Sequence, residues 1–71
     1  MIRKEKVRLL QEVGIDIRTY PQRPGDRFRI EAIYWDGSWH RYNTMGREQA
    51  EAGKLINYLY EELFFGGTGS E

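Results

Sequence analysis

The chain has 71 residues, no cysteine and a formal net charge of zero. A single domain of this size buries roughly 60% of the surface of its unfolded chain, so the sequence has room for one modest core. The lack of cysteine excludes disulfides and thiolate zinc sites. No apolar run approaches the ~20 residues that cross a bilayer, and no apolar segment follows Met1. We therefore expect a soluble, cytoplasmic protein with no membrane partner.

Charge is divided unevenly along the chain. Residues 1–29 carry a net charge of +4 and residues 30–71 a net charge of −4. One interpretation is a basic patch that meets an acidic partner or nucleic acid. The other is that the two halves complement each other within the fold.

The first predicted element is a helix over residues 2–13, where apolar residues recur at helical spacing and Gly14 follows as a C-terminal cap. Residues 15–20 alternate and are rich in β-branched side chains, which predicts a strand with Ile15, Ile17 and Thr19 facing inward. Residues 21–26 predict a loop, because Pro24-Gly25 suits the centre of a type II turn.

Residues 26–43 predict a β-hairpin. Asp36-Gly37 between two alternating runs is typical of a two-residue type I′ turn, which needs positive φ at both central residues. The turn also fixes the register, so that each residue of one strand has a defined partner on the other. The predicted pairs are Trp35 with Ser38, Tyr34 with Trp39, Ile33 with His40, Ala32 with Arg41 and Glu31 with Tyr42.

Alternation with period two divides this hairpin into two faces. We expect the core face to carry Phe28, Ile30, Ala32, Tyr34, Trp39 and Arg41. We expect the opposite face to be exposed, with a mixed Arg and aromatic surface made of Arg27, Arg29, Glu31, Ile33, Trp35, Ser38, His40 and Tyr42.

After the hairpin, Thr44 or Gly46 is expected to cap a long helix that ends near Phe65. Its predicted inward residues are Ala52, Leu55, Ile56, Leu59 and Leu63. Gly53 within this helix indicates close approach to another element. Residues 1–65 then form one domain, and residues 66–71 predict a flexible Gly-rich tail.

The expected fold class is α+β: one αβββα domain whose three-stranded antiparallel sheet has both helices on one face. Two helices cover only one side of such a sheet, so the Arg and aromatic face is left to solvent or to a partner. We expect a non-enzymatic protein that docks on a protein partner, as an inhibitor from a phage or mobile element or as an adaptor. The expected contact residues are Arg29, Ile33, Trp35, His40 and Tyr42. A purely structural cluster of Trp35 and Tyr42 is the alternative.

The element order resembles that of double-stranded RNA-binding domains, which implies RNA or single-stranded DNA as an alternative partner. The predicted nucleic-acid contacts are Arg27, Arg29, Trp35 and Tyr42. That family usually carries a basic cluster at the start of its second helix, whereas residues 45–51 contain one Arg and two Glu. The resemblance is therefore limited to the order of the elements.

Catalysis has only weak support in the sequence. Ser38, His40 and Glu31 share a predicted face, but no strained turn or oxyanion hole accompanies them. We expect no catalytic residues, no cofactor and no metal site. A homodimer could form through the exposed sheet face or through the region of Tyr58, Phe64 and Phe65.

Overall fold

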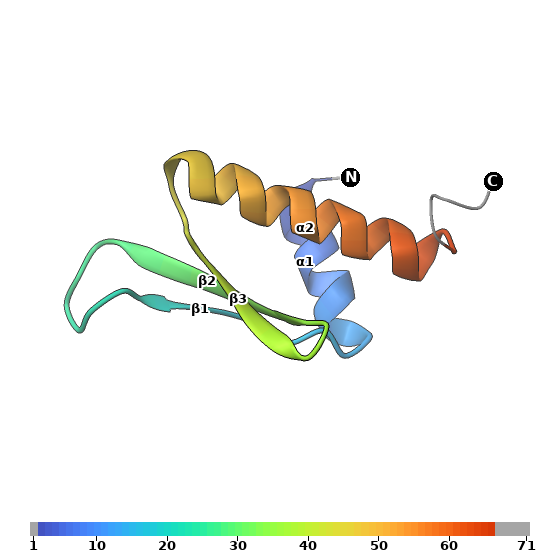
Figure 1. Cartoon of the computed structure of the whole chain (residues 1–71), viewed down its shortest axis with the longest axis horizontal. Coiled ribbons are helices and arrows are strands. Elements are labelled where there is room, and N and C mark those ends of the chain that lie inside the picture. Colours follow the sequence, from blue (N-terminus) through green and yellow to red (C-terminus); the bar gives the residue numbers. More distant parts are fainter. Residues whose placement is uncertain (1, 67–71) are drawn as a thin grey trace.

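A computed structural model describes residues 2–66 and shows the αβββα order expected from the sequence (Figure 1). The elements are α1 (Arg3–Glu12), β1 (Ile17–Pro21), β2 (Arg29–Trp35), β3 (Ser38–Asn43) and α2 (Gly46–Phe64). The three strands form one antiparallel sheet in the order β1-β2-β3. The expected tail lies, except for Gly66, outside the described residues. No helix within residues 2–66 combines the length and apolar character needed to cross a membrane.

The predicted turns that join the strands are present. Asp36 and Gly37 have φ of 57° and 82°, as a type I′ turn requires, and the five predicted hairpin pairs are all found. Gly25 has φ of 81°, and the Asp26 N–H donates to the Arg23 carbonyl at 2.9 Å. This geometry closes the predicted turn between β1 and β2.

The core lies between the sheet and the two helices, which cover the same side of it (Figure 1). Both helices contribute to a single buried cluster, which consists of Leu10, Ile17, Ile33, Ile56 and Leu59. Side chains also join the layers by hydrogen bonds. Lys6 Nζ of α1 donates to Asn57 Oδ1 of α2 at 2.9 Å, and Gln11 Nε2 of α1 donates to the Ile17 carbonyl of β1 at 2.9 Å.

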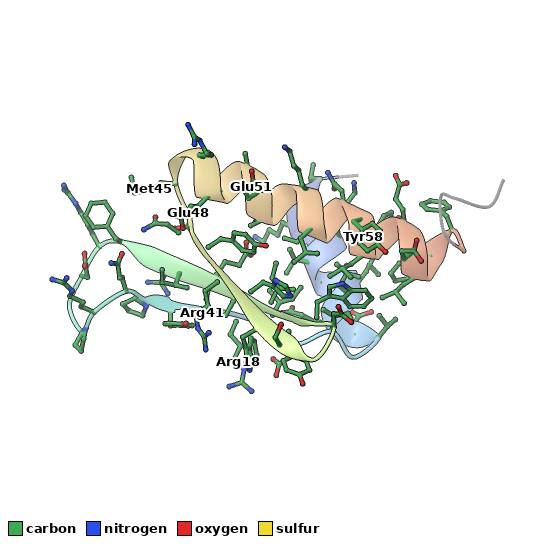
Figure 2. All side chains as sticks on the ribbon, in the orientation of Figure 1. Arg18, Arg41, Met45, Glu48, Glu51 and Tyr58 are labelled. Carbon is green, nitrogen blue, oxygen red and sulfur yellow. The ribbon has the colours of Figure 1, made fainter. Side chains whose placement is uncertain are left out.

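Two expectations about α2 are wrong. Its N-cap is Met45, which gives no side-chain cap, rather than Thr44 or Gly46. Glu48 instead accepts a hydrogen bond from the Asn43 N–H at 2.7 Å, which holds the end of β3 against the first turn of the helix (Figure 2). Leu63 is exposed rather than buried, because the C-terminal end of α2 extends beyond the sheet (Figure 1).

An ion pair holds α1 against the sheet. Glu31 of β2 is only 5% exposed, and its carboxylate accepts a hydrogen bond from the Arg3 guanidinium of α1. A buried carboxylate is costly unless a cation and a hydrogen bond compensate it. Arg3 therefore allows a charged residue to lie on the covered side of the sheet.

Replacing Arg3 with Ala is expected to lower the free energy of unfolding by about 1–2 kcal/mol, because the buried Glu31 carboxylate loses its partner while water screens the half-exposed Arg3 end of the pair. The double variant Arg3→Met with Glu31→Leu is expected to recover most of this loss, since neither charge remains. Urea unfolding followed by circular dichroism measures both. Equal stability of Arg3→Ala and the parent protein would show that the pair contributes nothing.

Gly53 does not mark a close approach, which corrects the expectation from the sequence. A Cβ atom added at this position would have no neighbour within 4 Å. The glycine lies inside α2, where it costs conformational entropy without a packing benefit.

Gly53→Ala is therefore expected to raise the free energy of unfolding by about 0.5–1 kcal/mol. Gly37→Ala is the matched control and should lower the free energy of unfolding, because φ of 82° strains any residue with a Cβ atom. Thermal unfolding of the two variants beside the parent protein gives both values. A lower free energy of unfolding for Gly53→Ala than for the parent protein would contradict the open space around this position.

Candidate binding face

The sheet exposes the face that the sequence predicted to be core, and buries the face predicted to be exposed. Ile33 has 0% exposure and lies in the centre of the core. Trp35 and Tyr42 pack against the same cluster, and the Trp35 ring meets the Tyr58 ring of α2 edge to face, with centroids 6.2 Å apart. The predicted exposure of Ile33, Trp35 and Tyr42 is wrong.

The pairing of β1 with β2 explains this inversion. Ile17 pairs with Ile33, so the inward side of β1 and the Ile33 side of β2 are the same side of the sheet. The sequence correctly placed Ile17 inward but did not establish its partner. Glu31, which the register placed on the face predicted to be exposed, lies on the covered side in an ion pair with Arg3.

The other predicted contact residues are dispersed. Arg29 and Arg27 are exposed near the loop between β1 and β2, where the Arg27 guanidinium lies 5.3 Å from the centroid of the Phe28 ring. His40 is half-buried on the covered side, and its Nε2 lies 3.1 Å from the Trp35 carbonyl oxygen. The structure thus brings Ile33, Trp35 and Tyr42 together, but within the core.

The Ser38, His40 and Glu31 constellation lacks the geometry of a catalytic triad. Ser38 Oγ lies 3.5 Å from His40 Nε2, but the same nitrogen faces the Trp35 carbonyl, which can only accept a hydrogen bond. The Nε2 proton is therefore directed to that carbonyl and leaves no lone pair for Ser38. Glu31 is engaged by Arg3. This arrangement offers no activated nucleophile.

The open side of the sheet, which we call the outer face, carries a different set of Arg and aromatic side chains. It consists of Arg18, Tyr20, Ile30, Ala32, Tyr34, Trp39 and Arg41. Figure 2 shows Arg18 and Arg41 on the side of the sheet away from α2.

Arg18 and Trp39 form the centre of the outer face. The Arg18 guanidinium lies 5.4 Å from the centroid of the Trp39 ring and donates from Nε and Nη2 to the Asp16 carboxylate at 3.1 and 3.2 Å. The hydrogen bonds and charge of Asp16 raise the pKa of Arg18 above its ordinary value. The Tyr34 ring meets Trp39 edge to face, at 5.3 Å between centroids. Arg18 and Tyr34 thereby hold the indole in place.

Further contacts join β1 directly to β3 across the middle strand. Arg41 Nε of β3 donates to the Tyr20 hydroxyl of β1 at 3.1 Å. Asn43 Nδ2 donates to Gln22 Oε1 at 3.2 Å next to them. These bonds connect residues that pair with Ala32 and Ile30 of the middle strand. The outer face is therefore an ordered layer rather than a set of independent side chains.

This layer encloses a shallow hollow above Ala32. The hollow has a volume of about 290 Å³ and is lined by Arg18, Tyr20, Ala32, Trp39 and Arg41. Ala32 is only 2% exposed although no helix covers it, because the longer side chains of β1 and β3 lean over it. Cationic and aromatic walls around a small floor suit recognition of a planar or anionic group.

A second exposed apolar cluster lies at the C-terminal end of α2. Tyr60 contacts Phe64 and Phe65, with centroids 5.0 and 5.6 Å apart, and Lys6 Nζ lies 5.2 Å from the Tyr60 ring centroid. Tyr58 does not belong to this cluster, since it packs against Trp35. A homodimer through this region stays a prediction.

Comparison of the chain with protein-family models, curated proteins and solved structures found no match. Within residues 2–66, no three His, Asp or Glu side chains gather in a way that could hold a metal ion. The residues that sequence reasoning missed are Arg18, Tyr20, Tyr34, Trp39 and Arg41. The predicted pairing of Tyr34 with Trp39 was a signal for them, since it placed two large aromatic rings on one face.

The two tryptophans are expected to differ in their effect on stability. Trp35→Ala removes a ring that packs against the core and should lower the free energy of unfolding by about 3 kcal/mol. Trp39→Ala removes a ring on the outer face and should cost about 1 kcal/mol. Urea denaturation of both variants makes the comparison, and a larger loss for Trp39→Ala would contradict this assignment of the two faces.

Proposed function

We propose that this protein is a non-enzymatic binding domain that docks on a protein partner through its outer face. The observation that carries the proposal is the ordered layer of Arg and aromatic side chains on the uncovered side of the sheet. Tyr34 is 43% exposed at one end of this layer. Tyr, Trp and Arg are the residues most enriched in binding hot spots.

Preorganisation supports this role for the layer. A side chain that is already fixed loses little conformational entropy when a partner binds, so more of the contact energy contributes to affinity. Trp39 is fixed by Arg18 and Tyr34, and Arg41 is fixed by Tyr20. The docked partner would be inhibited or recruited by this contact, and we place the interaction in the cytoplasm.

Nucleic acid is the second candidate, favoured by the loop between β1 and β2. Arg23, Arg27 and Arg29 are exposed there, and none forms an ion pair with the described residues. Affinity for RNA or DNA comes mainly from neutralising several phosphates at once. On the outer face Asp16 already matches the charge of Arg18, and the Arg18 guanidinium lies over the Trp39 ring where a base would stack. These features favour a protein partner.

The test is affinity capture from a nuclease-treated cell lysate with three immobilised proteins: the parent, Tyr34→Ala with Trp39→Ala, and Phe65→Ala. Phe65 is 67% exposed at the far end of α2, so it matches the loss of exposed aromatic surface without touching the outer face. We expect the parent and Phe65→Ala to retain the same protein, and the double variant to lose it. The retained protein is then identified, purified and titrated onto the parent to confirm direct binding.

Circular dichroism shows whether the double variant is folded. Arg41→Glu provides a second test that reverses a charge on the outer face and keeps all of its aromatic rings, and it should also abolish capture. Retention of the same protein by both variants would overturn the proposal. A protein that the parent captures from an untreated lysate but not from the nuclease-treated one would assign the interaction to nucleic acid.

A further inference from the structure

We propose that the hollow above Ala32 binds a carboxylate side chain from an acidic segment of the protein partner. This inference rests on the proposed function and specifies its chemistry.

The sheet register places two cations on opposite sides of one small residue. Arg18 of β1 and Arg41 of β3 both pair with Ala32 of β2, so their Cα atoms lie about 10 Å apart, two strand spacings. Both arginines line the same hollow. Alanine at the central position keeps the floor of the hollow low, and the longer side chains on either side, which lean over Ala32, form its walls.

Arg41 has unused hydrogen-bonding capacity in this position. Of the five N–H groups of a guanidinium, Arg41 uses the one on Nε for the Tyr20 hydroxyl. Its four terminal N–H groups have no acceptor among residues 2–66, and no carboxylate of these residues pairs with it. A carboxylate accepts two parallel N–H bonds from such a group. Tyr20 fixes the orientation in which Arg41 offers them.

Asp16 acts on the other side of the hollow as an internal competitor. Its carboxylate takes the Nε and Nη2 edge of Arg18, which is the geometry that an incoming carboxylate would use. Removing the Asp16 charge therefore frees a second guanidinium for the partner. A partner carboxylate should consequently bind more tightly to Asp16→Asn than to the parent protein.

A carboxylate fits this hollow better than a phosphate backbone does. Only Arg41 brings an unmatched charge to the hollow, which suits a single anionic group rather than the several phosphates that a nucleic acid presents together. The walls formed by Tyr20 and Trp39 add apolar surface beside the charge. Such mixed surroundings are typical of a side chain docked at a protein interface.

The test is a titration of isotope-labelled protein with poly-L-glutamate, followed by nuclear magnetic resonance. The two tryptophans provide an internal control, because the Trp39 indole lines the hollow and the Trp35 indole faces α2. We expect saturable shifts of the Trp39 indole and Arg41 Nε–H signals and none at Trp35. Arg41→Gln should weaken binding about five- to tenfold, and Asp16→Asn should strengthen it about two- to fivefold.

The matched control is Arg47→Gln, which removes an equal charge from an exposed position on α2. Equal weakening by Arg41→Gln and Arg47→Gln would show that only net charge matters and would overturn the inference. Stronger shifts of Trp39 with oligouridylate or inorganic phosphate than with poly-L-glutamate would do the same. Self-association that Arg41→Gln abolishes, detected by light scattering, would assign the hollow to a second copy instead.

The outcomes separate this inference from the proposed function. Capture that depends on Tyr34 and Trp39, without any response to poly-L-glutamate, leaves the docking face in place and overturns carboxylate recognition. The opposite result is a response of the parent protein to poly-L-glutamate at Trp39, together with unchanged capture by the double variant Tyr34→Ala with Trp39→Ala. It would show that the captured partner does not bind the outer face.

Discussion

The cross-strand pair of Ile17 and Ile33 determines which side of the sheet is apolar. These two residues face each other on neighbouring strands and form the sheet's contribution to the buried cluster. A shift of this register by one residue would turn every side chain of one strand to the opposite side. The position of the helices, the burial of Trp35 and the exposure of Trp39 all depend on this one pairing.

The two sides of the sheet are stabilised by different physics. On the covered side, Ile33 and the helix residues are removed from water, and the hydrophobic effect dominates. On the outer face, no second layer exists among the described residues, and long side chains from β1 and β3 cover β2 through hydrogen bonds and ring contacts. Such contacts are individually weak in water. A partner that excludes water from them would strengthen them, which ties the stability of this layer to binding.

Local chemistry made most of the fold predictable from the sequence. The Asp36-Gly37 turn defined the hairpin and its five pairs, because a two-residue loop allows only one register. The helices followed from apolar periodicity. The loop between β1 and β2 imposes no such constraint, since its length does not determine which residue of β1 meets Ile33. That missing register is why the element order was correct and the two faces were exchanged.

The candidate site was harder to predict because both faces carry aromatic residues. Trp35 and Trp39 lie on opposite faces of the hairpin, and alternation alone cannot say which of them meets the helices. The ion pair of Arg3 with Glu31 joins residues that are far apart in the chain, so no local sequence pattern indicates it. The sequence predicted an open sheet face with Arg and aromatic side chains, and the outer face has this composition. The individual residues predicted for that face lie elsewhere.

The hydrogen bond from Gln11 to the Ile17 carbonyl has a consequence for how this small sheet avoids aggregation. Edge strands present unpaired backbone groups on which further chains can stack. On β1, Gln11 occupies one of these acceptors, and Pro21 has no N–H to offer at the end of the strand. A chain approaching this edge would find an interrupted ladder. Addition of a further strand is therefore less favourable at both ends of β1 than along an uninterrupted edge.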